Sequence, residues 1–190
     1  MQEIEIKFRV TSIPSLTEGL HRHGFKLLTV RTHEMNTIYD RAGGALRERG
    51  ELLRLRKYGE VWTVTFKAKA VVGLHKSRRE IETTVADGPA FHEILTALGY
   101  KPGFAYEKFR TEFTDGHGHV VIDETPIGDF GEIEGEPDWI DSVARRLEIS
   151  PENYLTDSYA GLFMQWKRAT GSRAERMLFA EIDKKQNQKS

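Results

Sequence analysis

Polar and apolar residues alternate strictly in several short segments of the chain. At the amino terminus, the stretch EIEIK places Glu3, Glu5 and Lys7 on one side of an extended segment and isoleucines on the other. Period-two alternation is typical of a β-strand whose two faces differ chemically. The same pattern recurs in six further segments, which are 52–58, 61–69, 78–85, 106–113, 119–124 and 130–136.

Turn signals separate these segments and set their spacing. They include Gly43-Gly44, Gly50, Gly59, Gly73 and the stretch DGHG at 115–118. Short strands punctuated in this way predict a mainly antiparallel sheet of roughly eight strands, closed into a barrel or folded as a sandwich.

Four other segments carry apolar residues at helical spacing, at 12–24, 87–99, 137–149 and 157–169. Ser12 and Asp87 are candidate N-caps, each followed by a proline in the first turn. From Gly171 onward we expect a short amphipathic helix that fades into a polar tail. The sequence therefore predicts an α+β fold, with one domain over residues 1–170 and a C-terminal helical tail over 171–190.

Composition narrows the classes of function. The 190 residues carry 28 Lys and Arg against 29 Asp and Glu, a net charge of −1, and no cysteine. This balance argues against a general nucleic-acid or membrane-surface binder, which needs a basic excess. No apolar run approaches the ~20 residues of a membrane-spanning helix. We expect a cytoplasmic protein without nucleic-acid or membrane partners, as a monomer or homodimer.

The polar faces of the predicted strands are densely charged. Their acids are Glu3, Glu5, Glu80, Glu82, Glu112, Asp123, Glu132 and Glu134, and their bases are Lys7, Arg9, Arg54, Arg56, Lys67, Lys69, Arg78, Lys108 and Arg110. One interpretation is a solvated outer face with cross-strand ion pairs worth ~0–1 kcal/mol each. The alternative is the interior of a closed barrel, because the charges recur with little dilution and the opposite faces are apolar enough to be covered by helices.

A barrel lined with both positive and negative side chains favours one kind of ligand. Buried charges must be paired or meet a ligand. Arginine and lysine bind phosphate oxygens, while clustered carboxylates bind Mg²⁺ or Mn²⁺. Carboxylates two residues apart on one strand, as at Glu3 and Glu5 and at Glu132 and Glu134, lie ~7 Å apart on the same side and can flank hard cations. The lining thus predicts a polyanion that carries divalent cations.

These motifs resemble those of the CYTH superfamily, the triphosphate tunnel metalloenzymes, which include class IV adenylate cyclases, thiamine triphosphatases and inorganic triphosphatases. EIEIK is similar to the family's ExExK signature. The similarity continues in order through NTIYD (36–40), LLRLRKY (52–58), TVTFKAK (63–69), SRREIE (77–82), EKFRTEF (107–113), VVIDETPIGDFGEIEGE (120–136) and SYAGLF (158–163). It covers residues 1 to about 165 and implies an eight-stranded antiparallel barrel that encloses a tunnel, with helices packed outside.

The resemblance also implies roles for individual residues. The metal-binding carboxylates, for Mg²⁺ or Mn²⁺, would be Glu3, Glu5, Asp123, Glu132 and Glu134. The triphosphate would be bound by Arg54, Arg56, Lys67, Arg110, Lys7 and Lys108, to which we add Lys69, Glu80 and Glu82 from the same strand faces. Lys67 matches a lysine that activates the attacking water in family hydrolases. We therefore take Lys67, Glu5 and Glu134 as the catalytic candidates.

Three functions remain open at this level. We favour a metal-dependent hydrolase of an inorganic or organic triphosphate, because it needs only a bound triphosphate and water. A class IV type adenylate cyclase would hold ATP with the same contacts but use the ribose hydroxyl as nucleophile. A silent polyphosphate binder is disfavoured because cations alone would suffice for it, whereas the carboxylate set is complete.

Smaller signals have mostly structural interpretations. His117 and His119 lie in a glycine-rich segment and are expected in a solvated turn instead of a zinc site. Tyr39 is expected to pack, while Asp40 stays undecided. The aromatic residues Trp62, Phe66, Phe109 and Trp166 are expected in the core between sheet and helices, with a base-stacking platform as the alternative.

Overall fold

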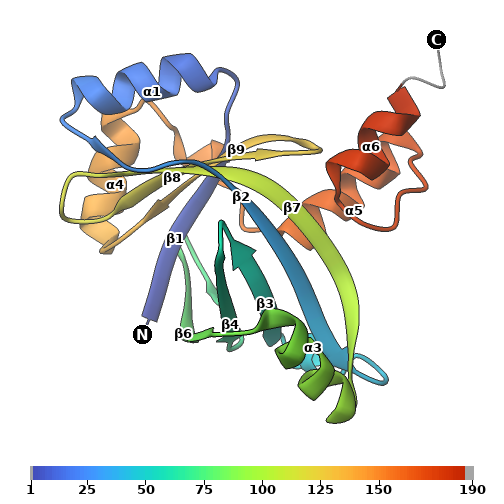
Figure 1. Ribbon diagram of the computed structural model, residues 1–190. Helices are drawn as coiled ribbons and strands as arrows, with labels where there is room; N and C mark the ends of the chain where they lie inside the picture. The colour runs from blue at the N-terminus through green and yellow to red at the C-terminus, as the bar shows by residue number, and fades with distance from the viewer. Residues whose placement is uncertain (1, 187–190) are drawn as a thin grey trace.

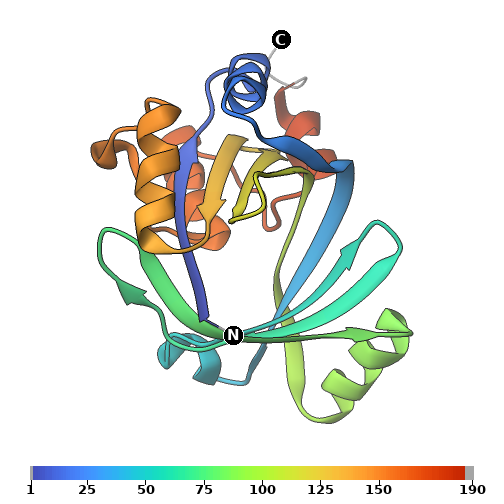
Figure 2. The ribbon, with the colours of Figure 1, turned by 90° about the vertical axis from the view of Figure 1, so that its left-hand side faces the viewer.

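Eight antiparallel strands form a closed barrel (Figures 1 and 2). The computed structural model describes residues 2–186, with side chains for residues 2–182. Around the ring the strands are β1 (Gln2–Arg9), β9 (Gly128–Glu134), β8 (His119–Thr125), β7 (Tyr100–Thr114), β2 (Lys26–Arg41), β3 (Leu52–Tyr58), β4 (Val61–Lys67) and β6 (Lys76–Val85). Pairing of β1 with β6 closes the ring. The expected α+β fold with an eight-stranded barrel is confirmed.

A ninth strand of two residues, β5 (Val71–Val72), continues the pairing of β4 along β6. Seven of the eight barrel strands coincide with the alternating segments of the sequence. The longest strand, β2, was not among those segments. Its inward residues mix charge, amide and aliphatic groups, and its pairing with β7 contains register shifts, so it shows no simple alternation.

Helices cover much of the outside of the barrel. They are α1 (Ile13–Arg22), α2 (Ala45–Glu48), α3 (Gly88–Ala97), α4 (Pro137–Arg146), α5 (Tyr159–Thr170) and α6 (Phe179–Gln186), with a 3₁₀ turn at Pro151–Asn153. The predicted caps hold: Ser12 accepts a hydrogen bond from the Ser15 amide and Asp87 one from the Ala90 amide. No helix within residues 2–186 is long and apolar enough to cross a membrane.

Apolar side chains pack in three clusters between strands and helices. One joins β1, β8 and β9 to α1 and α4 through fully buried residues such as Leu20, Ile133 and Val143. A second lies under α5 and α6, and a third lies under α3. The helices leave part of the outer face uncovered, since Ile81 on β6 is about half exposed at 51%.

The C-terminal segment departs from its predicted form. The helix expected from Gly171 begins only at Phe179. Before it, Met177 is fully buried and pairs with Tyr106 of β7, exchanging main-chain hydrogen bonds of 3.1 Å with Ala105 and Glu107. Extended backbone at this point satisfies the free edge of β7, which a helix could not do. The division into a domain and a tail stays a prediction, and residues 187–190 lie outside the described part of the chain.

Candidate active site

The barrel encloses a cavity of about 940 Å³. Inward positions of seven strands line it, because successive residues of a strand point to opposite faces. Most of the residues predicted from the sequence reach this cavity, namely Glu3, Glu5, Lys7, Arg54, Arg56, Lys67, Glu80, Glu82, Lys108, Arg110, Glu132 and Glu134. The charged faces therefore form the interior of the barrel, and the solvated outer face is the wrong interpretation for these positions.

Two predicted residues lie elsewhere. Lys69 follows the last residue of β4 and is exposed, with its stem against Gly50. Asp123 is fully buried behind the cavity wall, because the cations on neighbouring β7 cover it. Their expected roles in substrate and metal binding stay predictions, and neither residue is among those that line the cavity.

On the wall formed by β4, β6 and β1, ion pairs link the three strands. The Lys67 ammonium lies between Glu3, at 2.5 Å, and Glu80, at 2.8 Å. Arg78 donates to the other oxygen of Glu3 at 3.0 Å, and Lys76 donates to Glu5 at 2.7 Å. Burial by itself would raise the pKa of Glu3, but Lys67 and Arg78 outweigh it and hold this pKa at about 2.

On the wall formed by β7, β8 and β9, a second network surrounds Asp123. Arg110 donates to both oxygens of Asp123, at 2.7 and 2.6 Å, and to Glu132 at 2.6 Å. Lys108 and the Tyr159 hydroxyl also donate to Asp123, at 2.7 and 2.5 Å. Lys7 of β1 completes the network through Glu132. Bidentate guanidinium pairs of this kind are among the strongest ion pairs, so this wall is rigid.

Glu134 differs from the other acids of the cavity. It lies directly across from Glu5 in the β1–β9 register, yet its carboxylate makes no hydrogen bond or ion pair with the described side chains. Burial, together with the neighbouring charges of Glu3, Glu132 and Glu5, raises the pKa of Glu134 to about 7. The acids of β1 and β9 thus form a crowded group that lacks positive charge at one corner.

The donors at this corner suit Mg²⁺ or Mn²⁺, which prefer carboxylate oxygens. Glu3, Glu5, Glu132 and Glu134 supply such oxygens into one cavity. Within residues 2–182, however, no three acidic or histidine side chains are already arranged around one point. Glu3, Glu5 and Glu132 hold lysines and arginines instead. A cation would therefore have to replace some of these ion pairs, whereas Glu134 can bind it without losing a partner.

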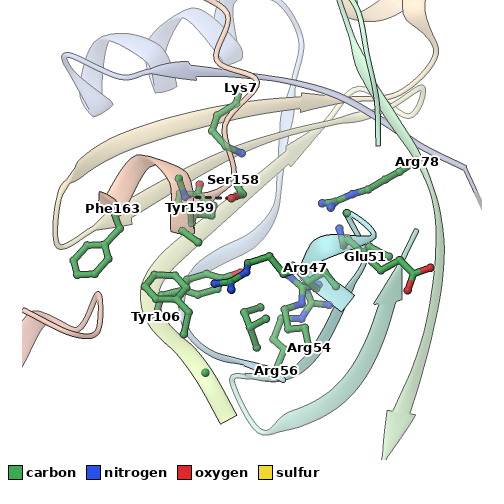
Figure 3. A pocket seen from close by; sticks show the side chains of 18 of the residues that line it. Lys7, Arg47, Glu51, Arg54, Arg56, Arg78, Tyr106, Ser158, Tyr159 and Phe163 are labelled. Carbon is green, nitrogen blue, oxygen red and sulfur yellow. Dashed lines mark hydrogen bonds between the residues drawn. The ribbon is translucent and has the colours of Figure 1, made fainter. Parts of the chain in front are cut away.

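Arg54 and Arg56 of β3 add two guanidiniums to the basic side chains of the lining (Figure 3). The Arg56 guanidinium donates to both oxygens of Glu82, at 2.9 and 3.1 Å, and Arg54 lies 3.6 Å from the same carboxylate. Arg54 also donates to Thr65 at 3.2 Å. Its Nε atom is buried without a hydrogen-bond partner. Both guanidiniums thus line the cavity and share Glu82 as an anionic partner.

Several polar residues of the barrel were missed in the sequence, and those of β2 lie in its wall and are not among the residues that line the cavity. Glu34 and Asn36 of β2 are fully buried, and one oxygen of each has no hydrogen-bond partner. Lys108 and Arg110 outweigh the effect of burial and keep the pKa of Glu34 far below its usual range. Arg47 of α2 and Lys76 of β6, which were missed as well, do line the cavity. The same-face charges of RREIE in 78–82, continued backwards, would have identified Lys76, but β2 offered no such signal.

The smaller signals are resolved by their contacts. Asp40 accepts hydrogen bonds from the main-chain amides of Arg41, Leu46 and Arg47, so it fixes the loop that leads into α2. Tyr39 is packed in the core, with its hydroxyl 2.6 Å from His92.

The two histidines of the glycine-rich segment, His117 and His119, are exposed at the β7–β8 turn, as expected. Trp62 and Trp166 pack against hydrophobic clusters, and Phe109 contacts Phe179 of α6. None of these aromatic residues lines the cavity, which fits the structural interpretation.

Comparison with known proteins agrees with this geometry. The profile of the CYTH domain matches residues 1–159. A Methanocaldococcus jannaschii protein named "Putative adenylate cyclase" is 26% identical over 173 residues, which are 85% of this chain and 98% of that protein.

Solved structures share the fold. A protein from Vibrio parahaemolyticus, described as a putative adenylate cyclase, superposes with a TM-score of 0.76 at 19% identity and covers 85% of this chain and 97% of its own. The PH1012 protein of Pyrococcus horikoshii superposes with a TM-score of 0.70 at 24% identity, over 83% and 96% of the two chains. A Hippeastrum protein described as having a dominant triphosphatase activity gives 0.65 at 18% identity, over 86% and 95%.

Proposed function

Because the chain belongs to the CYTH domain family, we propose that it is a divalent-metal-dependent hydrolase that cleaves a triphosphate bound inside the barrel. The observation that carries the proposal is the cavity lining, in which a basic wall and a group of carboxylates face the same space. A site that binds phosphate without metal ions would not need carboxylates, because carboxylates repel phosphate. Both signs together suit a phosphate chain that carries cations.

The cationic side chains of β3, β7 and β1 would bind the phosphate chain. Arg54 and Arg56 each offer a planar fork that matches two phosphate oxygens. Lys7, Lys108 and Arg110 face them from the β1 and β7 side of the lining. Most of these groups form ion pairs with carboxylates, so a phosphate ligand would replace one set of anions by another.

Mg²⁺ or Mn²⁺ would be held by Glu3, Glu5, Glu132 and Glu134. A divalent cation in such a site supplies Lewis-acid stabilisation of charge on the transferring phosphoryl group. Lys67, which lies between Glu3 and Glu80, would orient the attacking water. Glu5 and Glu134 complete the catalytic set that we propose. Residues 1–170 would form this catalytic unit, and we propose that it acts in the cytoplasm, as a monomer or homodimer.

An adenylate cyclase is the second candidate. It is favoured by the name of the 26% identical Methanocaldococcus protein. The same wall could hold ATP while the ribose 3′-hydroxyl attacks the α-phosphorus and pyrophosphate leaves.

One experiment separates these functions. The purified protein is incubated with Mg²⁺ or Mn²⁺ and, separately, with tripolyphosphate, ATP and thiamine triphosphate, and all products are resolved by chromatography. We expect orthophosphate and the corresponding diphosphate. Formation of cyclic AMP and pyrophosphate would instead identify the protein as an adenylate cyclase. Tight binding without any product would identify it as a non-catalytic polyphosphate binder.

A further inference from the structure

Glu34 of β2 is a fully buried carboxylate that the proposed hydrolysis does not use, and it is not among the residues that line the cavity. Its strand lies between β3 and β7, and Glu34 lies directly across from Lys108 in the β2–β7 register. Bases from both neighbouring strands act on its charge, namely Arg54, Arg56, Lys108 and Arg110. All four line the cavity, so an anion bound there meets bases that have an acid fixed behind them.

The contacts between Glu34 and these bases are long. One of its oxygens lies 3.5 Å from the Lys108 Nζ atom, and the other lies 3.9 Å from an Arg56 nitrogen. Other acids hold the same side chains more closely: Asp123 accepts from Lys108 at 2.7 Å, and Glu82 accepts from Arg56 at 2.9 and 3.1 Å. These acids therefore set the orientation of the bases, whereas Glu34 acts on the cavity mainly through its electric field.

The charge of Glu34 is permanent and cannot be displaced by a ligand. Burial by itself would raise the pKa of Glu34, but the four bases outweigh burial and hold this pKa far below its usual range. The Asn36 amide donates to one oxygen at 2.9 Å and helps to keep the carboxylate in place. Glu82 and Glu132 line the cavity, so they can yield their bases to a phosphate group. Glu34 is enclosed, and its charge opposes every anion that enters.

We propose that Glu34 is an internal counter-anion that limits the affinity of the cavity for phosphate chains, so that the products of hydrolysis can leave. This inference rests on the proposed function for the identity of the ligand. One guanidinium separates Glu34 from a phosphate group bound to Arg56, a separation on the order of 8 Å. At an effective dielectric constant of about 20, a unit charge at this distance changes the affinity for an anion by about tenfold or more. Changes in affinity appear mainly in the dissociation rate.

The test measures binding separately from turnover. Dissociation constants are determined by titration calorimetry for diphosphate with saturating Mg²⁺, and for tripolyphosphate with a chelator that prevents metal-dependent hydrolysis. Glu34→Gln removes the charge and keeps the shape of the side chain. Two controls disturb the same position without removing the charge: Glu34→Asp shortens the side chain, and Asn36→Ala removes the hydrogen bond to Glu34. Thermal unfolding with and without tripolyphosphate follows the stability of each variant.

We expect E34Q to bind both ligands about tenfold more tightly than the unmodified protein, while the two controls bind as the unmodified protein does. E34Q should also be less stable without ligand, because four bases lose a buried anion. Tripolyphosphate should raise its melting temperature more than that of the unmodified protein. In steady-state kinetics, E34Q should show a lower KM and stronger inhibition by diphosphate.

Unchanged or weaker binding by E34Q would show that Glu34 only supports the bases, and this result would overturn the inference. Tighter binding by all three variants would also overturn it, because loosened packing and not charge would then be the cause. Failure of E34Q to fold even with tripolyphosphate would count against it equally, since the phosphates should replace the missing charge. The expected binding pattern in a protein that cleaves no triphosphate would refute the hydrolase and support the role of Glu34.

Discussion

Replacing Glu134 by glutamine should stabilise the metal-free protein. The side chain keeps its shape but loses a negative charge that is crowded by Glu3, Glu132 and Glu5. Because burial and these neighbours raise the pKa of Glu134 from 4.5 to about 7, the folded protein holds this proton more tightly than the unfolded chain does. The contribution of Glu134 to the free energy of unfolding is therefore most favourable below pH 4.5, where the carboxyl is protonated in both states. This contribution is lost as the pH rises through 7 and the folded protein also ionises.

The expected size of the effect follows from the same pKa values. A tenfold change in an equilibrium corresponds to about 1.4 kcal/mol, so ionisation of Glu134 lowers the free energy of unfolding by about 3 kcal/mol at pH 8. At pH 5 most of the carboxyl is protonated, and the loss falls to about 1 kcal/mol. Glutamine does not titrate. The free energy of unfolding of the E134Q variant should thus be higher than that of the unmodified protein by about 3 kcal/mol at pH 8 and by about 1 kcal/mol at pH 5.

Urea unfolding at both pH values, with a chelator present, measures these differences. Glu132→Gln is the control, because it removes a charge of the same sign that is held by Lys7 and Arg110. Leaving two buried cations without this partner should destabilise the protein by about 3 kcal/mol. Added Mg²⁺ should stabilise the unmodified protein more than E134Q. Equal stability of E134Q and the unmodified protein at pH 8, or a gain of the same size at both pH values, would refute the reasoning.

Other predictions concern turnover and local structure. Glu5→Gln should abolish hydrolysis while circular dichroism stays unchanged, and retained activity at saturating Mg²⁺ would exclude Glu5 as a ligand. Arg56→Ala should raise KM more than it lowers kcat, because a guanidinium binds phosphate in ground and transition states alike, whereas Lys67→Ala should mainly lower kcat. Identical KM-type defects in steady-state kinetics would reject the proposed role of Lys67 and favour the cyclase. Asp40→Ala should cost about 1–2 kcal/mol in urea unfolding, through three lost main-chain hydrogen bonds, and no loss would remove its structural role.

Alternation predicted most of the barrel because an inward charge and an outward apolar group are opposite in character at every step. The inference failed for β2, where a charged residue (Glu34), an amide (Asn36) and an aliphatic residue (Ile38) share the inward face, so the polarity of that face changes along the strand. Alternation left open whether the ring closes, and the closed barrel that the resemblance to the CYTH superfamily implied is confirmed. The covering of the outer face was overestimated, because apolar residues such as Ile81 stay exposed.

The pairing of charges could not be predicted from the sequence. Asp123 and Glu134 both belong to the expected carboxylate set, yet Asp123 is held by Lys108 and Arg110, whereas Glu134 makes no ion pair with the described side chains and is crowded by other acids. The difference depends on which residues neighbouring strands bring opposite each acid. Register places Arg110 across from Asp123 and Glu5 across from Glu134. The sequence of one chain reveals the two faces of each strand but not the register in which neighbouring strands pair.

Closure of the barrel by β1 has a consequence for folding. This strand precedes the other described strands along the chain, but its ladder partners are β6 and, at residues 128–134, β9. Contacts so distant along the chain require large loops to close, which slows folding in proteins of high contact order. Until the ribosome has released β9, the EIEIK segment has no partner on one edge. The ion pairs between Lys7 and Glu132, and the crowding of Glu5 with Glu134, therefore arise together in a late step of folding.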